Sequence, residues 1–283
     1  MCSAKTQELY NNISRVDTGQ NRSHGEAYHL KVYHNRIKRL LIEAFARNAD
    51  SLFDLGTGRG GDLLKWQHAN IKFVQGIDSS PNSLDEARYR FRQLRSSSSC
   101  KVVLNHVENF GFEDFENKFA PFTAVSSMFA LHYFFETERA LHQTICNVSN
   151  MLQSRGVFFG CVPHGLRVLQ KLDGAGSYKT DFLNLSLKHA TTIACFGSVC
   201  EIAIKDTVTE QQSSEFLVFE NVLTTVAAMY GLYPIINYPQ PLMDALCTED
   251  AKKVFKHFDP QFSKTPEQQE ASSLFCTFAF IKR

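Results

Sequence analysis

The chain has 283 residues, 43% of them hydrophobic, and a formal net charge of +1. This length and composition support a full hydrophobic core and exclude an intrinsically disordered chain. The near-neutral charge argues against a dedicated non-specific nucleic-acid binder, which is usually strongly basic.

Helix and strand patterns alternate through the first part of the chain. Residues 1–27 are polar and aperiodic, so we expect a flexible segment before a single domain over 28–283. Apolar residues at helical spacing predict a helix over 28–47. Strands are predicted at 51–56, 72–78, 101–107, 122–131 and 156–163, with helices at 61–69, from Pro81 onward, and at 136–153. This alternation predicts a mostly parallel sheet with helices on both faces.

The pattern changes after about residue 172. Strand-like runs at 182–187, 191–196 and 199–204 have no helices between them, which predicts a small antiparallel insert over about 173–213. Residues 214–232 resemble one long helix that ends at Gly231. Residues 273–283 predict a final strand, for which an antiparallel place at the far side of the sheet is one option.

A glycine-rich turn, DLGTGRGGDLLKW, occupies residues 54–66 between a predicted strand and a predicted helix. Gly56, Gly58 and Gly61 match the G-x-G-x-x-G pattern of dinucleotide-binding loops. Asp54 and Asp62 flank the turn, and carboxylates at both edges would repel a pyrophosphate. They suit a ligand whose nearby end is cationic.

Two more residues bear on the ligand of this turn. Asp78 ends the second predicted strand and can accept hydrogen bonds from both ribose hydroxyls. Together with the flanking carboxylates it favours S-adenosylmethionine over NAD. Arg59 weakens that preference, because it can pair with a phosphate. A turn needed only for close packing of helix and strand is the plain alternative.

Aromatic residues gather in the segment SSMFALHYFFE, residues 126–136. It lies at the carboxyl end of the fourth predicted strand, where ligands bind in open α/β sheets. Phe129 and Tyr133 can stack on a flat base, and His132 can donate or accept at a base edge. From this segment alone, packing of Phe129 and His132 in the core is an equally good interpretation.

These segments and their order resemble the eukaryotic-type mRNA cap guanine-N7 methyltransferases, which are class I S-adenosylmethionine-dependent enzymes. The three most similar segments are DLGTGRGGDLLKW, GIDSSPNSLDEARYRF and FALHYFFE; HNRIKRLLI, SSEFLVF and LFCTFAFIK also resemble family segments. The similarity spans about residues 33–282. It implies a Rossmann-like, mostly parallel seven-stranded sheet with helices on both faces, and methyl transfer from S-adenosylmethionine to N7 of the terminal guanine of GpppN-RNA.

The resemblance also implies two adjoining pockets. The implied donor-binding residues are Lys38, Asp54, Gly56, Gly58, Asp62, Asp78, His106, Met128 and Phe129. The implied cap-binding residues are His34, Arg59, Arg90, Phe129, His132, Tyr133, Pro163, Glu215 and Phe275. The sequence departs from the family pattern at His34, Met128, His106 and Phe275.

Guanine N7 has a free lone pair and no proton, so we expect no residue to act as a general acid or base. The residues His132, Tyr133 and Glu215 are expected to position the guanine. Eight scattered cysteines show no CxxC pair and no zinc-site spacing, and we expect no metal. Without the resemblance, Glu215 would be assigned more readily to a solvated first turn of a helix.

Two other functions stay open at this level. One is a methyltransferase acting on another base or a small molecule, and the other is a non-catalytic cap-binding regulatory subunit. The expected partners are the capped 5′ end of mRNA and a separate RNA triphosphatase or guanylyltransferase. The resemblance favours a nuclear location. We expect a monomer and no membrane association, since no apolar run approaches the roughly 18 residues of a membrane span.

Overall fold

A computed structural model describes residues 25–94, 99–188, 193–207, 213–259, 261 and 265–283. The flexible segment predicted over 1–27 lies almost entirely outside these residues. No helix in the described part of the chain is both long and apolar enough to cross a bilayer.

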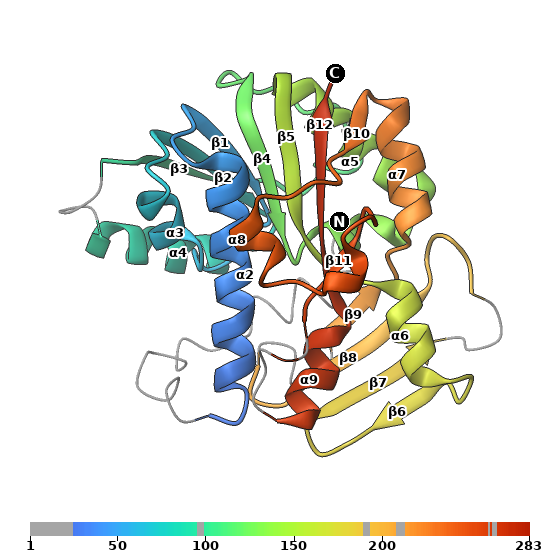
Figure 1. Cartoon of the computed structure of the whole chain (residues 1–283). Helices are drawn as coiled ribbons and strands as arrows, with labels where there is room; N and C mark the ends of the chain where they lie inside the picture. The colour runs from blue at the N-terminus through green and yellow to red at the C-terminus, as the bar shows by residue number, and fades with distance from the viewer. Residues whose placement is uncertain (1–24, 95–98, 189–192, 208–212, 260, 262–264) are drawn as a thin grey trace.

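The larger of two sheets forms the centre of the molecule (Figure 1). Its strands are β1 (Ser51–Leu55), β2 (Phe73–Asp78), β3 (Lys101–His106), β4 (Phe122–Met128), β5 (Leu152–Pro163), β10 (Leu232–Pro234), β11 (Lys256–His257) and β12 (Phe275–Lys282). Seven strands follow the order β10-β12-β5-β4-β1-β2-β3, and β11 pairs with β12. Strands β1 to β5 pair in parallel, whereas β12 is antiparallel to β5 and β10. The predicted mostly parallel sheet is confirmed. Its final strand lies inside the sheet instead of at its far side.

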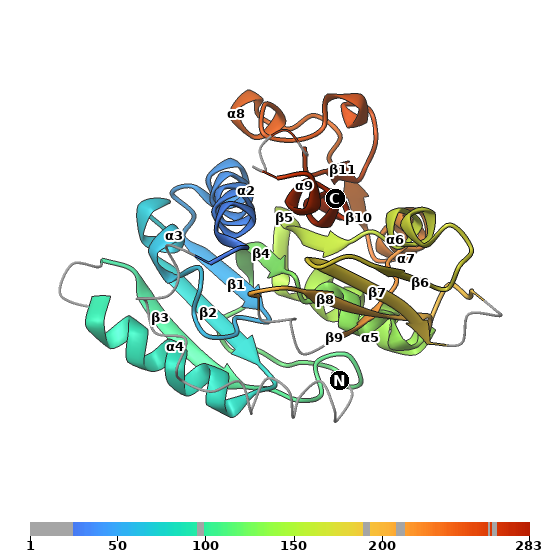
Figure 2. The same cartoon turned by 90° about the horizontal axis from the view of Figure 1, so that it is seen from below.

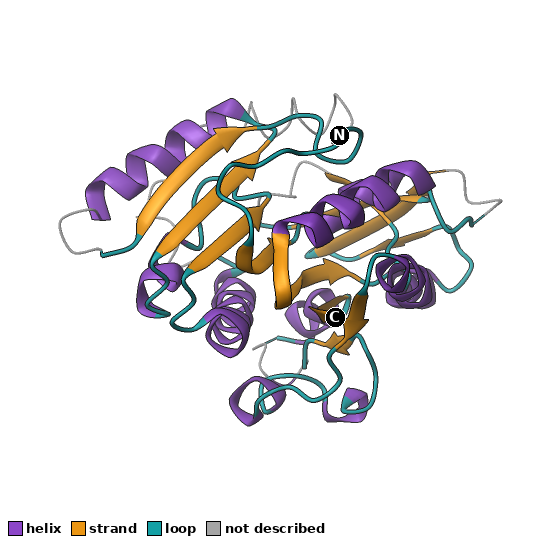
Figure 3. Cartoon of the chain, turned by 90° about the horizontal axis from the view of Figure 1, so that it is seen from above, coloured by secondary structure: helices purple, strands orange, loops and turns teal. Residues whose placement is uncertain are grey.

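Helices flank this sheet (Figure 3). They are α2 (Tyr28–Ala46), α3 (Leu63–His68), α4 (Pro81–Leu94), α5 (Glu138–Met151), α6 (Gly165–Leu172), α7 (Glu220–Met229), α8 (Gln240–Met243) and α9 (Pro266–Ser273), with 3-10 helices η2 (Leu131–Glu136) and η4 (Thr248–Asp250). One buried cluster draws on α2, α3 and α8, and a second on η2, α5 and α7.

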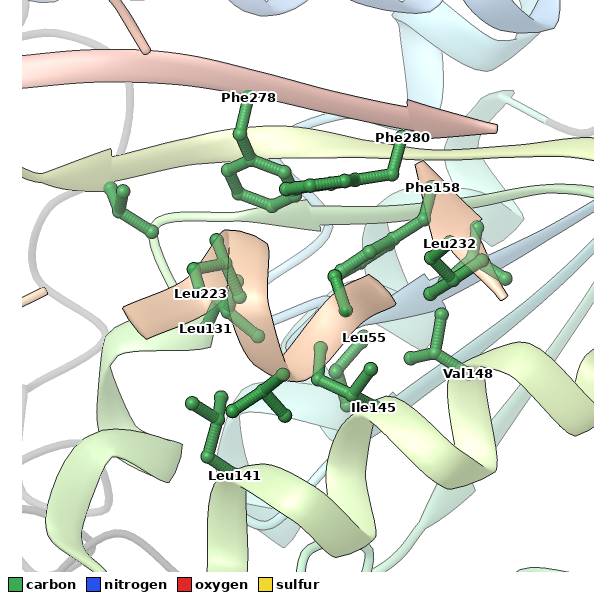
Figure 4. Close-up of a cluster of buried hydrophobic side chains, with 14 of the residues drawn as sticks. Leu55, Leu131, Leu141, Ile145, Val148, Phe158, Leu223, Leu232, Phe278 and Phe280 are labelled. Carbon is green, nitrogen blue, oxygen red and sulfur yellow. The ribbon is translucent and has the colours of Figure 1, made fainter. Parts of the chain in front are cut away.

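Helix α5 shows how sequence pattern produces this packing. The Thr137 hydroxyl caps the helix by accepting a hydrogen bond from the backbone of Ala140 at 3.1 Å. Leu141, Ile145 and Val148 follow at helical spacing and are fully buried. Figure 4 shows these side chains below the aromatic rings of β5 and β12. Each buried aliphatic side chain contributes roughly 1.5–3 kcal/mol through the hydrophobic effect.

A second, four-stranded antiparallel sheet lies beyond the carboxyl ends of β1 and β4 (Figures 1 and 2). Its strands are β6 (Ser177–Lys179), β7 (Leu183–Lys188), β8 (Val199–Ile204) and β9 (Ser213–Phe216), in that order. This sheet confirms the small antiparallel insert of the predicted fold class. It reaches Phe216, and its last strand therefore extends past the expected boundary at residue 213.

Three sequence-based assignments were wrong in detail. Residues 214–232 are not one helix, because β9 pairs with β8 and α7 begins only at Glu220. Residues 193–196 of the expected strand 191–196 are not in a strand, and 191–192 lie outside the described residues. The fourth strand stops at Met128, since Phe129 takes a left-handed conformation with φ of 59°. The aromatic segment after it therefore lies on η2.

Candidate active site

A cavity of about 1040 Å³ lies at the carboxyl ends of β1, β2 and β4 and reaches the second sheet. Small-molecule sites usually measure roughly 300–1,000 Å³, so this cavity has room for two adjoining ligands. The predicted site residues in its lining are His34, Lys38, Gly56, Gly58, Arg59, Asp62, Asp78, Arg90, Met128, Phe129, His132, Tyr133, Pro163, Glu215 and Phe275. Asp54 and His106 do not line it.

The glycine turn after β1 forms one wall of the cavity. Gly56 has a φ of 82°, and a Cβ there would lie 2.3 Å from the Cβ of Ala130, so only glycine fits. A Cβ on Gly58, whose φ is 55°, would meet no atom within 4 Å. The turn therefore presents bare backbone to open space.

Asp78 at the end of β2 is fixed by this turn. Its Oδ2 accepts a hydrogen bond from the backbone N–H of Gly58 at 2.7 Å, and its Oδ1 accepts one from Ser80 at 2.8 Å. Burial raises the pKa of Asp78, and the backbone hydrogen bonds only partly oppose that rise. A carboxylate has about four lone-pair positions, and the backbone N–H groups of Gly58, Ser79 and Ser80 engage three of them, so capacity to accept from a hydroxyl in the cavity remains.

Asp54 lies beneath the turn and is 2% exposed. Its two oxygens accept hydrogen bonds from the hydroxyls of Ser126 at 2.5 Å and Thr57 at 2.9 Å. The carboxylate therefore ties the turn to β4 and does not face the cavity. Burial, followed by the negative charge of Asp62, raises the pKa of Asp54 to about 6, although the two hydroxyls lower it.

Asp54 should make folding stability depend on pH. Its folded pKa of about 6 exceeds its ordinary value of 3.8, so between these values the unfolded chain ionises first and stability falls as pH rises. Relative to Asp54→Asn, the wild type should lose roughly 2–3 kcal/mol of unfolding free energy between pH 4 and pH 7. Denaturant titrations at several pH values measure this difference. The exposed Asp85→Asn variant is the control, and an equal pH dependence in both variants would contradict the assignment.

Asp62, at the other edge of the turn, is held by two lysines. Its carboxylate lies 2.7 Å from Lys38 Nζ and 2.8 Å from Lys65 Nζ. Burial alone would raise the pKa of Asp62, but the two ammonium groups outweigh it and lower the pKa. The argument that Asp62 attracts a cationic ligand is therefore weakened, because its charge is already neutralised inside the protein.

The far end of the cavity contains a buried glutamate. Glu215 of β9 is 5% exposed, and its carboxylate directly contacts His132 Nε2. The Tyr133 hydroxyl lies 3.5 Å from Glu215 Oε1. Burial raises the pKa of Glu215, but the charge of His132 and hydrogen bonds from His132, Ser213 and Tyr133 lower it overall. The carboxylate is therefore ionised while buried.

Two departures from the family pattern meet in one aromatic cluster. The His34 ring lies 5.1 Å from the Phe275 ring and stacks on Phe129 at 5.7 Å. Its Nε2 lies 3.1 Å from the Ser272 hydroxyl. Burial, followed by the charge of Lys38, lowers the pKa of His34 to about 3. His34 is therefore a neutral wall of the cavity between its two ends.

His106 does not line the cavity. Its Nε2 contacts the backbone carbonyl of Ser79 at 3.1 Å and the Glu108 carboxylate at 3.3 Å. Glu108 lines the cavity instead, because β3 ends at His106 and the following residues form the wall. In the sequence, the feature that could have identified this wall residue is the acidic side chain of Glu108, two positions after His106.

Comparison with known proteins shows the family. The model of the mRNA (guanine-N(7))-methyltransferase domain matches residues 2–283. The chain belongs to this family. It is an S-adenosylmethionine-dependent mRNA cap guanine-N7 methyltransferase, as the resemblance implied.

Relatives of this cap methyltransferase include three proteins named as mRNA cap guanine-N(7) methyltransferases. The Saccharomyces cerevisiae protein is 28% identical over 98% of this chain and 69% of its own length. The Schizosaccharomyces pombe protein is 26% identical over 95% of the chain and 80% of its own length. The Arabidopsis thaliana protein is 34% identical over 51% of the chain and 41% of its own length.

Solved structures agree on the fold. A putative S-adenosylmethionine-dependent methyltransferase from Listeria monocytogenes superposes with a TM-score of 0.55 at 17% identity, covering 90% of this chain and 99% of its own. The N-methyltransferase NodS from Bradyrhizobium japonicum, in complex with S-adenosyl-L-homocysteine, gives a TM-score of 0.52 at 12% identity, covering 98% and 96%. At these identities the likeness establishes the class I methyltransferase fold alone.

The cavity of the cap methyltransferase fits a nucleoside donor. Open space over Gly58 and the spare lone pairs of Asp78 suit a ribose. Val107 and Phe110 provide an apolar wall for a base. At the opposite end, His132 Nδ1 is buried and has no hydrogen-bond partner among the described residues. Those residues also contain no group of three potential metal ligands.

Proposed function

We propose that Glu215, His132 and Tyr133 hold the terminal guanine of GpppN-RNA for methylation at N7. The burial of the Glu215 carboxylate at the far end of the cavity, beside His132 and Tyr133, is the observation that supports this assignment. Its two oxygens can accept hydrogen bonds from guanine N1–H and N2–H₂. Adenine offers no such pair of donors, so it would forgo both of these hydrogen bonds and bind poorly.

In this mechanism the protein positions the reactants and supplies charge. The donor, when bound, supplies a methyl group on a positively charged sulfur. Phe129 and Pro163 confine the guanine ring so that N7 lies in line with the methyl group at near-attack distance. Positive charge develops on the ring as N7 is methylated, and the Glu215 carboxylate stabilises it. No general base is needed because N7 carries no proton.

The remaining roles divide between the two ends of the cavity. We assign Asp78 to the donor ribose. The absence of side chains at Gly56 and Gly58 lets the donor approach the backbone of the turn closely. Arg59 and Arg90 are assigned to the cap triphosphate. Arg90 is partly engaged, since its Nε lies 2.7 Å from Glu86. Bidentate geometry makes arginine well suited to phosphate oxygens.

The partners are also proposals. We infer that a separate RNA triphosphatase and guanylyltransferase supply the cap, and that the enzyme acts as a monomer in the nucleus.

A KxDG tetrapeptide, the sequence pattern of the lysine that guanylyltransferases modify with a nucleotide, occurs at residues 171–174. Its Lys171 pairs with Glu270 at 2.6 Å, has a raised pKa and does not line the cavity, which argues against a nucleophilic role.

The function is tested with labelled S-adenosylmethionine and three acceptors: GpppA, GTP and ApppA. We expect transfer to GpppA and GTP, with the label on N7 of guanine after digestion, and none to ApppA. Donor binding without transfer to GpppA would contradict the cap assignment. It would favour a methyltransferase of another substrate or a regulatory cap-binding subunit.

A further inference from the structure

One face of α2 lines the mouth of the cavity. Besides Leu30, His34 and Lys38, six residues of α2 line it, namely Tyr28, Lys31, Val32, Asn35, Arg36 and Arg39. The spacings of three, four, seven, eight and eleven residues place them on one side of the helix, and we call this set the α2 stripe. At 1.5 Å per residue the stripe is roughly 16 Å long.

The α2 stripe connects the two sides of the cavity mouth. In its carboxyl-terminal half, Asn35 Oδ1 accepts a hydrogen bond from Lys65 Nζ at 2.9 Å, and the same ammonium group donates to the Gly61 carbonyl at 2.8 Å. That half therefore adjoins the glycine turn. In its amino-terminal half, Lys31 lies 3.4 Å from Asp206, two residues after the end of β8 in the second sheet.

Charge is distributed unevenly over the cavity. Six basic residues line it, namely Lys31, Arg36, Lys38, Arg39, Arg59 and Arg90, against four acidic ones, namely Asp62, Asp78, Glu108 and Glu215. Asp62 neutralises Lys38, and Glu215 lies deep in the cavity with 5% exposure. Arg39, in contrast, is exposed. It lies one helical turn after Asn35, on the part of α2 that adjoins the glycine turn containing Arg59.

Apolar groups lie beside these cations. Tyr28 is 37% exposed and Val32 is 48% exposed, and they lie one helical turn apart on the stripe. Cations that follow a backbone, interleaved with an exposed aromatic ring, are typical of surfaces that bind single-stranded nucleic acid through phosphates and stacked bases. A surface for a folded protein partner would not require continuity with the cavity.

We infer that the α2 stripe binds the RNA chain on the 3′ side of the cap. Arg39 contacts a backbone phosphate. Lys31 contributes less, because its ammonium group is partly neutralised by the Asp206 carboxylate. Tyr28 and Val32 pack against the bases. This inference rests on the proposed function and extends the substrate from the cap to the first nucleotides of the transcript.

The test compares the wild type with Arg39→Gln and a matched control, Arg47→Gln. Arg47 follows the same helix, its side chain is 57% exposed, and it does not line the cavity. For each protein, kcat/KM is measured with GpppA and with capped RNAs of 5 and 20 nucleotides at several salt concentrations. Circular dichroism confirms the helix content of each variant.

The wild type should prefer the capped RNAs over GpppA. Arg39→Gln should reduce that preference by roughly five- to tenfold and lower the slope of log kcat/KM against log salt by about 0.7, as expected for one lost phosphate contact on a single strand. Arg47→Gln should leave both unchanged. An unchanged preference in Arg39→Gln, or an equal loss in both variants, would overturn the inference while transfer to GpppA leaves the proposed function intact. Absence of transfer to GpppA by the wild type would overturn both.

Discussion

Replacing Glu215 with glutamine should lower kcat/KM for methyl transfer to GpppA by roughly 10²-fold or more. The carboxamide keeps one acceptor but turns an amino group toward the guanine donors, and it removes the negative charge that stabilises the methylated ring. S-adenosylhomocysteine binding, measured by calorimetry, should change little, because Glu215 lies at the opposite end of the cavity from Asp78.

A matched substitution separates this effect from damage to the second sheet. Glu201 lies on the neighbouring strand β8, where its carboxylate pairs with Lys188 at 2.9 Å and does not line the cavity. Glu201→Gln should retain activity on GpppA. If Glu215→Gln retained it too, the guanine would have to be recognised elsewhere and the proposed pocket would be abandoned.

Replacing Asp62 with alanine should destabilise the folded state by about 3–5 kcal/mol, because it leaves Lys38 and Lys65 buried without their shared counterion. Urea denaturation of the purified protein measures this loss. A triple variant that also carries Lys38→Met and Lys65→Met should regain most of the stability, since the uncompensated charges are then gone.

The exposed ion pair of Asp50 with Lys72 provides the comparison. Its distance of 2.6 Å is as short as those in the buried cluster, but the two side chains are 77% and 70% exposed. Asp50→Ala should cost less than about 1 kcal/mol because water solvates both charges. Equal losses in Asp50→Ala and Asp62→Ala would show that burial does not set the energy of the cluster.

The parallel half of the fold could be predicted because its signals are local. The glycines at 56 and 58, the aspartate at the end of β2 and the period of α2 each depend on neighbouring residues. The predicted strand boundaries there agree with the structure to within about three residues, except at the start of β5. The glycine turn and Asp78 also occupy the same wall of the cavity, as their positions after parallel strands require.

Assignments that depend on distant partners were harder. Glu215 lies in a run of apolar residues that also suits a helix, and only pairing with β8 makes it a strand. Asp54 lies in the signature turn, yet Ser126 on another strand turns it away from the cavity. Lys38 could not be identified as a partner of Asp62 until α2 was packed beside the glycine turn. These contacts are set by tertiary structure, and no local pattern encodes them.

The residues proposed to bind the donor and Glu215, proposed to bind the guanine, lie on parts of the fold that differ in local stability. The proposed donor contacts lie at central parallel strands, whereas Glu215 lies on β9, which pairs with β8 alone among the described residues. Edge strands open at a lower free energy than central ones. A subglobal opening of the small sheet would therefore produce an enzyme that still holds its donor but no longer distinguishes guanine. On the proposed assignment, substrate fidelity would depend on the smaller sheet, whose edge strand carries Glu215.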